Sequence, residues 1–131
     1  MSKKRRSYEA GHSPKFMVVI DDSPECDRAL YFASRRALRI GATVLMLRVI
    51  ETRDHNGVMP QRVIREGDKA QEVLNLIEDD EDIAILVLAA ATGKEGPGPL
   101  VSSIGKNAGE FPIPVAIVPG HLSDEELDAM S

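Results

Sequence analysis

Two segments of this sequence carry residues that could bind a ligand. Asp21 directly follows the apolar run 16–20, and a carboxylate at the end of a buried strand can accept a hydrogen bond from an amino group. Farther along, Gly93, Gly96 and Gly98 lie in the loop after the most apolar segment of the chain. A glycine-rich loop that opens a helix can bring unpaired backbone N–H groups to a phosphate. The sequence therefore indicates a candidate ligand-binding carboxylate and a candidate phosphate loop, each following an apolar strand.

Both segments also have a purely structural interpretation. Pro97 and Pro99 lack N–H donors and stiffen the loop, which counts against a phosphate site. Ser102 and Ser103 follow in the first turn of an expected helix, where a hydroxyl can bind a phosphate or simply cap the helix. Asp21 can equally be a solvated turn residue. The residues alone leave these alternatives open.

No group of residues has the pattern of a catalytic or metal centre. His12, His55 and His121 are dispersed along the chain, and Cys26 is the only cysteine, so no thiolate cluster can hold zinc. Cys26 falls on the apolar side of an expected helix, where a buried inert thiol is the simplest interpretation. We therefore predict no metal site and no catalytic residue, and an enzymatic function is not expected.

Composition restricts the protein to a small class. The chain has 131 residues, 43% of them hydrophobic, which is enough for one core but leaves no room for a second domain. The net charge of −5 disfavours nucleic acid binding, which needs a continuous basic face. No apolar run approaches the ~20 residues of a membrane span. With one cysteine, a cytoplasmic location is expected.

Charge is concentrated at the two ends of the chain. Four basic residues lie in segment 1–14, and four acidic residues lie in segment 121–131. We expect both segments to be solvated tails, a flexible basic one and an acidic one, around a domain at 15–120. Ser123 and Glu126 have the spacing to cap one final turn of helix in the acidic segment.

Hydrophobic periodicity predicts the elements that position these residues. Apolar runs typical of strands buried on both faces occur at 16–20, 43–50, 83–88 and 115–118. Segment 61–66 is short and partly polar, which favours an edge strand. Helical spacing predicts helices over 24–40, 68–77 and 100–109. We expect Ser23 and Asp68 to cap the first two helices, and Gly41 to end the first.

The order of these elements predicts a single α/β domain of three layers. Its sheet is expected to be doubly wound and mostly parallel, with about five strands and a ligand crevice at their carboxyl ends. One connection is unusual, because segment 51–60 contains Gly57 and Pro60 and lacks the apolar stripe of a helix. We predict that it forms no proper helix and leaves one face of the sheet thinly covered. How the strands beside it are joined is left open, since parallel strands normally need a crossover of about a dozen residues.

Particular residues add a family resemblance. Residues 18–23 resemble the opening motif of universal stress proteins, with Asp22 where glycine is usual. Segments 65–68, 85–88 and 112–119 resemble later segments of the family in the same order. The resemblance covers the expected domain. It implies an adenine nucleotide alpha hydrolase-like fold, a role in the stress response and, as in the nucleotide-binding members, a site for ATP or AMP with magnesium.

The resemblance also assigns candidate site residues. It gives Asp21 the place of the adenine-contacting aspartate, and Val49 a place where its backbone could contact the base. The family's phosphate pattern is glycine, two residues, glycine, nine residues, then glycine and serine or threonine. It falls here on Ala89, Thr92, Ser102 and Ser103. A shifted match begins at Gly93 and Gly96 with a shorter loop. Three glycines of the pattern are therefore replaced, and we expect any nucleotide binding to be weak.

The resemblance implies two further features. Universal stress proteins have a long helix between their second and third strands, which is missing here. They dimerise through the last strand, and an apolar strand at a sheet edge favours the same. We therefore expect a homodimer through Val115, Ala116, Ile117 and Val118.

Two functions follow from the sequence. The first is a regulatory or binding module of the stress response that holds an adenine nucleotide weakly, with a protein partner that the residues do not identify. The second is a dimeric stress scaffold of the same fold that binds no nucleotide. A slow ATPase or phosphotransferase is disfavoured, because no general base is evident near the glycine-rich loop.

Overall fold

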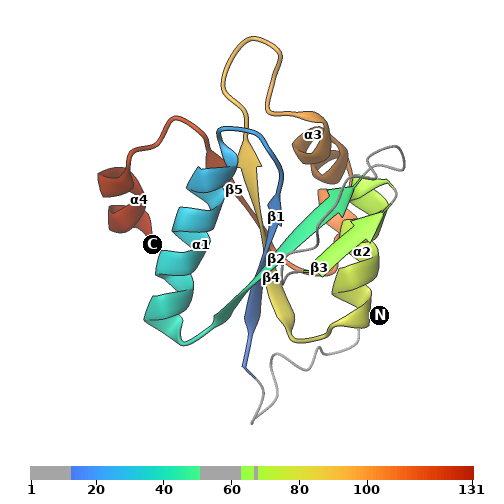
Figure 1. Cartoon of the computed structure of the whole chain (residues 1–131). Coiled ribbons are helices and arrows are strands. Elements are labelled where there is room, and N and C mark those ends of the chain that lie inside the picture. Colours follow the sequence, from blue (N-terminus) through green and yellow to red (C-terminus); the bar gives the residue numbers. More distant parts are fainter. Residues whose placement is uncertain (1–12, 51–62, 67) are drawn as a thin grey trace.

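The computed structural model describes residues 13–50, 63–66 and 68–131, and five of its segments are strands. They are β1 (Lys15–Ile20), β2 (Thr43–Ile50), β3 (Val63–Glu66), β4 (Ile83–Ala90) and β5 (Val115–Pro119). All neighbouring strands pair in parallel, in the order β3-β2-β1-β4-β5 (Figure 1). The predicted parallel sheet is confirmed, with β3 and β5 at its edges.

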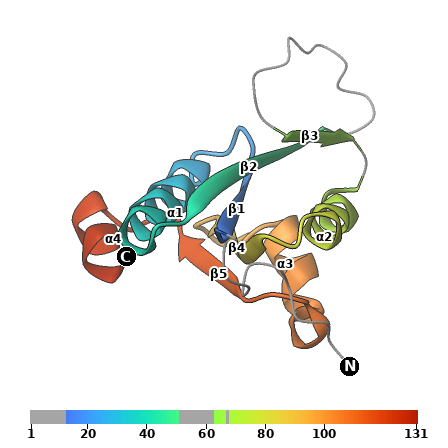
Figure 2. The same ribbon diagram turned by 90° about the horizontal axis from the view of Figure 1, so that it is seen from below.

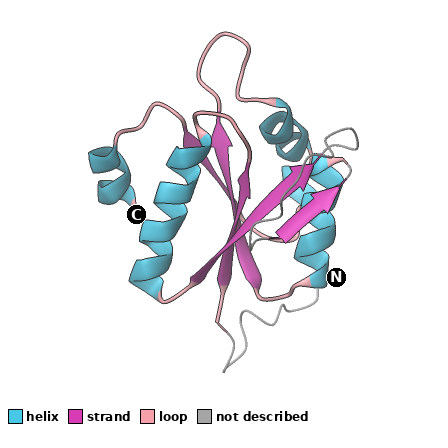
Figure 3. Ribbon diagram, in the orientation of Figure 1, coloured by secondary structure: helices cyan, strands magenta, loops and turns pink. Residues whose placement is uncertain are grey.

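Helices cover both faces of this sheet and make the three predicted layers. One face carries α1 (Cys26–Ile40) and α4 (Asp124–Met130), and the other carries α2 (Lys69–Asp79) and α3 (Pro99–Lys106) (Figure 2 and Figure 3). A single 3-10 turn, η2 (Ala108–Glu110), follows α3. The chain moves from β1 to β2 on one side and from β4 to β5 on the other, so right-handed crossovers place α1 and α3 on opposite faces.

An apolar core lies on each face of the sheet. Toward α2 and α3, the strands bury Met17, Val19, Leu47, Leu86 and Leu88. Toward α1 and α4, they bury Val18, Ile20, Val87 and Val118. Successive residues of β1 thus enter opposite cores, which is why its sequence is apolar without alternation.

The start of α1 differs from the prediction. Its N-cap is Glu25, and no side chain caps it. The Ser23 hydroxyl instead donates to Asp21 Oδ1, which also accepts the Ser23 N–H at 2.9 Å. Because this aspartate turn directs the hydroxyl back toward β1, Ser23 cannot cap the helix. At the other end, Gly41 adopts a left-handed conformation with φ 74° and ends α1 as predicted.

The acidic segment 121–131 is not a solvated tail. Ser123 and Glu126 form the capping box that their spacing predicts, and α4 continues from it for two turns. Leu127 on α4 is 1% exposed and belongs to the core beneath α1. The expectation of a solvated tail was wrong here because so short a helix, rich in acidic residues, gives almost no sequence signal for the burial of Leu127.

Ion pairs and a hydrogen bond connect α4 to α1. Arg28 pairs with Asp124 at 2.7 Å, and Arg35 pairs with Asp128 at 2.9 Å. The Tyr31 hydroxyl donates to Asp128 Oδ1 at 2.9 Å, and this hydrogen bond is the main cause that raises the pKa of Tyr31. The acidic residues of α4 therefore meet a basic stripe of α1.

Register explains how β2 and β3 can be joined by a short connection. Leu47 pairs with Val63 and Ile50 with Glu66, so β3 matches only the last part of β2. The connection returns about 10 Å along the strands, which a dozen residues span easily. The connection itself, 51–62, lies outside the described residues, so the missing helix stays a prediction.

Candidate functional site

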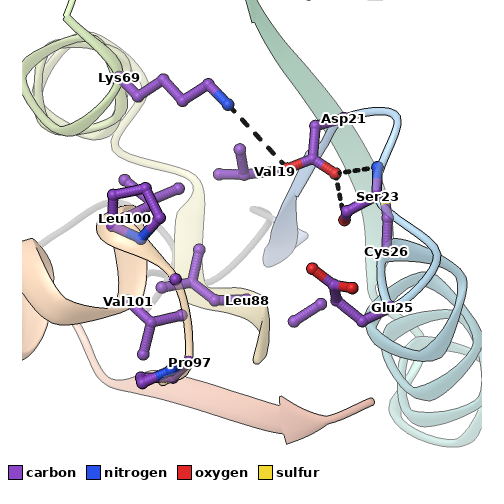
Figure 4. Close-up of a pocket in the computed structure, with 13 residues that line it drawn as sticks. Val19, Asp21, Ser23, Glu25, Cys26, Lys69, Leu88, Pro97, Leu100 and Val101 are labelled. Carbon is purple, nitrogen blue, oxygen red and sulfur yellow. Dashed lines mark hydrogen bonds and ion pairs between the residues drawn. The ribbon is translucent and has the colours of Figure 1, made fainter. Parts of the chain in front are cut away.

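A cavity of about 110 Å³ lies at the carboxyl ends of β1 and β4, between the first turns of α1 and α3 (Figure 4). We call it the β1–β4 cavity. The two strands are adjacent in the sheet, but the chain leaves them toward opposite edges. In parallel sheets this reversal of strand order leaves a crevice in which ligands bind. The predicted position of the ligand crevice therefore coincides with a real cavity.

Asp21 forms the part of the cavity wall at the end of β1. One carboxylate oxygen accepts both hydrogen bonds from Ser23, and the other lies 4.0 Å from Lys69 Nζ on α2 (Figure 4). The turn holds the carboxylate in place, while its second oxygen faces Lys69. A carboxylate oriented in this way can accept a hydrogen bond from an amino group.

Arg48 on β2 braces the loop that carries Asp21. Its Nη2 atom lies 3.1 Å from both carboxylate oxygens of Asp22. This hydrogen bond raises the pKa of Arg48, so the guanidinium stays charged. Asp22 thus links the loop to the neighbouring strand β2.

Glu25 contributes a second carboxylate to the cavity. Its side chain points into the cavity from the N-terminal end of α1 (Figure 4). Its carboxylate has no hydrogen bond or ion pair with any other residue that the structure describes. The sequence pattern did not point to Glu25, which is the N-cap of α1, or to Lys69, which follows the N-cap of α2, because neither has a spacing that links it to Asp21.

The opposite wall is the N-terminal end of α3. Gly98 is its N-cap with φ 110°, Pro99 is its first residue, and no side chain caps it. The Ser102 N–H already donates to Gly98 O at 3.0 Å. Pro99 has no N–H, so Gly98, Leu100 and Val101 are the residues that can offer backbone donors at this end.

Cys26 lies on the wall of the same cavity but is not activated. Burial is the main cause that raises the pKa of its thiol, and the negative charges of Asp21, Asp27 and Glu25 act in the same direction. A hydrogen bond involving the Asp21 backbone only partly opposes this shift. The thiol therefore stays protonated, in agreement with an inert buried cysteine.

The structure brings only some of the predicted site residues together. Asp21, Ala89 and Gly98 line the β1–β4 cavity. Val49 on β2 is buried in the core toward α2 and α3, and its side chain does not line the cavity. Its role in the predicted site is therefore limited to its backbone.

The other predicted residues lie farther along the chain. Thr92, Gly93 and Gly96 are in the loop that projects between β4 and α3 (Figure 1). Both glycines have positive φ, 116° and 92°, so the turns of this loop need them. On α3, Ser102 is exposed and Ser103 borders a different groove, between α2 and α3. None of these five residues lines the β1–β4 cavity.

Among the described residues, no group of three or more histidine, cysteine, aspartate or glutamate side chains could hold a metal ion. In the same part of the chain, no helix combines the length and apolarity that crossing a membrane requires.

Comparison with known proteins identifies similar folds. The universal stress protein family model matches residues 13–61, and no curated protein sequence matches the chain. The universal stress protein UspA from Lactobacillus plantarum is similar in structure, with a TM-score of 0.63 and 16% identity over 82% of this chain and 99% of that one. A universal stress protein from Archaeoglobus fulgidus has a TM-score of 0.58 and 13% identity, covering 86% of this chain and 98% of that one. The predicted resemblance and α/β fold are confirmed.

Proposed function

We propose that this chain is a binding or regulatory module of the stress response whose β1–β4 cavity holds an adenine nucleotide weakly. The observation that carries the proposal is the cavity at the point where the strand order reverses, with the Asp21 carboxylate on its wall. The similarity to universal stress proteins supports the cellular role.

The lining of the cavity suits an adenine base. Asp21 can accept a hydrogen bond from the exocyclic amino group. Val19, Leu88 and Leu100 add apolar surface against which a planar ring can pack. A few polar groups on an apolar wall are typical of small-molecule sites.

Three features support weak binding. The cavity of about 110 Å³ is smaller than the ~300–1,000 Å³ of typical ligand pockets, so it can enclose only part of a nucleotide. Three glycines of the family pattern are replaced, and Pro97 and Pro99 withdraw N–H donors. Each missing donor forgoes a charge-assisted hydrogen bond of ~1.5–3 kcal/mol. Two such losses weaken affinity by roughly a hundredfold, from the micromolar range toward the millimolar range.

The dimeric scaffold without nucleotide remains a second candidate. It is supported by Ile117, which is 46% exposed on the edge strand β5. A homodimer through β5 fits both functions, and we propose it for both. We also propose a cytoplasmic location, which the single buried cysteine favours.

Calorimetry with ATP and AMP in the presence of magnesium tests the proposed function. We expect dissociation constants between high micromolar and millimolar for the unmodified protein. Asp21→Ala should abolish the signal, whereas Asp27→Ala, which removes a carboxylate outside the cavity, should keep it. No heat at millimolar nucleotide would favour the scaffold. A submicromolar constant would contradict weak binding.

A further inference from the structure

The charges that line the β1–β4 cavity are unbalanced. Asp21 and Glu25 bring two carboxylates, and Lys69 is the one lysine or arginine among the described residues that line it. Lys69 Nζ lies 4.0 Å from Asp21 and so compensates that carboxylate. Within the described chain, the Glu25 carboxylate has no such partner. One uncompensated negative charge is left in the cavity wall.

Backbone packing holds Glu25 in this position. The Gly120 N–H donates to Ala90 O at 3.0 Å, which fixes the end of β5 beside β4. A Cβ atom on Gly120 would lie only 2.7 Å from Glu25 Cβ, so the first turn of α1 is packed closely against this glycine. Gly120 prevents the Cβ atom of Glu25 from shifting toward β5. The Glu25 side chain is therefore held pointing into the cavity.

The Glu25 carboxylate faces the same small space as the backbone N–H groups at the N-terminal end of α3. A phosphate at the N-terminal end of α3 would depend on the backbone N–H groups of Gly98, Leu100 and Val101, since Pro99 has none. In a cavity of about 110 Å³, a phosphate bound there would lie near Glu25 (Figure 4). The negative charges of the phosphate and of Glu25 would repel each other, and this repulsion is stronger where the protein excludes water. A neutral ligand with an amino group avoids this repulsion.

We propose that Glu25 is a specificity-determining residue that disfavours phosphate-bearing ligands, so that the cavity prefers an adenine nucleoside to the corresponding nucleotide. This inference rests on the proposed adenine site and adds to it the charge of the preferred ligand. Asp21 accepts the amino group of the base, while Glu25 opposes the phosphates.

Calorimetric titration of the full chain with adenosine, AMP and ATP, without magnesium, tests the inference. The unmodified protein should bind adenosine at least about tenfold more tightly than ATP. Glu25→Gln keeps the size of the side chain, and no capping hydrogen bond is lost, since the Glu25 side chain makes none. This variant should bind ATP about tenfold more tightly and adenosine within about threefold of the unmodified protein.

Glu95→Gln is the matched control. Glu95 is exposed in the loop before α3 and does not line the cavity, so this variant changes the net charge equally. It should leave both affinities unchanged. Salt gives a second measurement, because screening should raise ATP affinity in the unmodified protein and in Glu95→Gln, and much less in Glu25→Gln.

The outcomes separate the inference from the proposed function. If ATP binds as tightly as adenosine, or if Glu25→Gln behaves like Glu95→Gln, Glu25 does not select the ligand. Binding of adenosine, AMP or ATP that depends on Asp21 would then still support the adenine site. If none of the three ligands binds to the unmodified protein or to either variant, both proposals are wrong.

Discussion

Gly120 sets a close distance between the end of β5 and the start of α1. A Cβ atom there would lie 2.7 Å from Glu25 Cβ and 3.0 Å from Ala90 O. Gly120→Ala therefore forces α1 or β4 to shift, and we expect it to lower the free energy of unfolding by about 1–3 kcal/mol. Urea denaturation followed by circular dichroism measures this change.

Gly105→Ala provides the control for this substitution. Gly105 lies within α3, and a Cβ there meets nothing within 4 Å. Alanine has the higher helix propensity, so this variant should be more stable by about 0.5–1 kcal/mol. Equal effects of the two substitutions would show that close packing at Gly120 does not matter.

The site was only partly predictable at the level of single residues. The position of Asp21 at the carboxyl end of a strand could be predicted, because the end of an apolar run is a local sequence signal for it. Glu25 could not be assigned a role, because its position in the cavity depends on the distant Gly120. Lys69 reaches Asp21 across 48 positions of sequence, and only the strand order brings them together. Local patterns predict elements, whereas a cavity is made by their arrangement.

Among the elements, α4 depends on one buried side chain. Leu127 is 1% exposed in the core beneath α1, whereas Leu38 on α1 is 78% exposed. Leu127→Ala removes buried methyl groups and leaves a cavity, so we expect a loss of about 2–4 kcal/mol in the free energy of unfolding. Leu38→Ala should change it by less than about 0.5 kcal/mol. Similar losses in both variants would mean that α4 does not pack as described.

The capping box of α4 should make its stability depend on pH. Hydrogen bonding to Ser123 lowers the pKa of Glu126 below its ordinary value of 4.5. Because the folded pKa is the lower one, the stabilisation is complete above the ordinary pKa and is lost as pH falls through the folded pKa. Between about pH 6 and pH 3.5 the unmodified protein should therefore lose more stability than Glu126→Gln, which can keep the box but does not titrate. Parallel urea titrations that show equal losses would contradict this prediction.

The elements themselves were largely predictable, and the exceptions have physical causes. Both faces of β1 are buried, so its apolar run gave a clear signal, and Gly41 ends α1 because it supplies a left-handed conformation. Ser23 does not cap α1, because its hydroxyl donates a hydrogen bond to the Asp21 carboxylate instead. Packing of α4 was missed because it depends on tertiary contacts of Leu127, which periodicity cannot reveal in so short a helix.

At the scale of the whole molecule, the edge strand β5 should mediate the proposed dimer. Ile117 is 46% exposed there, whereas Val118 is buried in the core beneath α1. Ile117→Lys places a charge on the edge, which opposes strand pairing, and we expect a monomer by light scattering. Leu38→Lys changes an exposed leucine on α1 and should remain dimeric. An Ile117→Lys variant that stays dimeric would place the interface elsewhere.

The order of elements also determines when each core can close during synthesis. The segment from β1 to β2, which forms a βαβ unit in the folded protein, leaves the ribosome early. The core beneath α1 is complete only when Val118 and Leu127 have been added. Arg28 can form its ion pair only after Asp124, 96 positions later, has been synthesised. Until β5 and α4 have been made, the apolar side of α1 is therefore only partly covered, by β1, β2 and β4. Of the two cores, the one beneath α1 therefore exposes apolar side chains, and the risk of aggregation that they bring, for the longer time during synthesis.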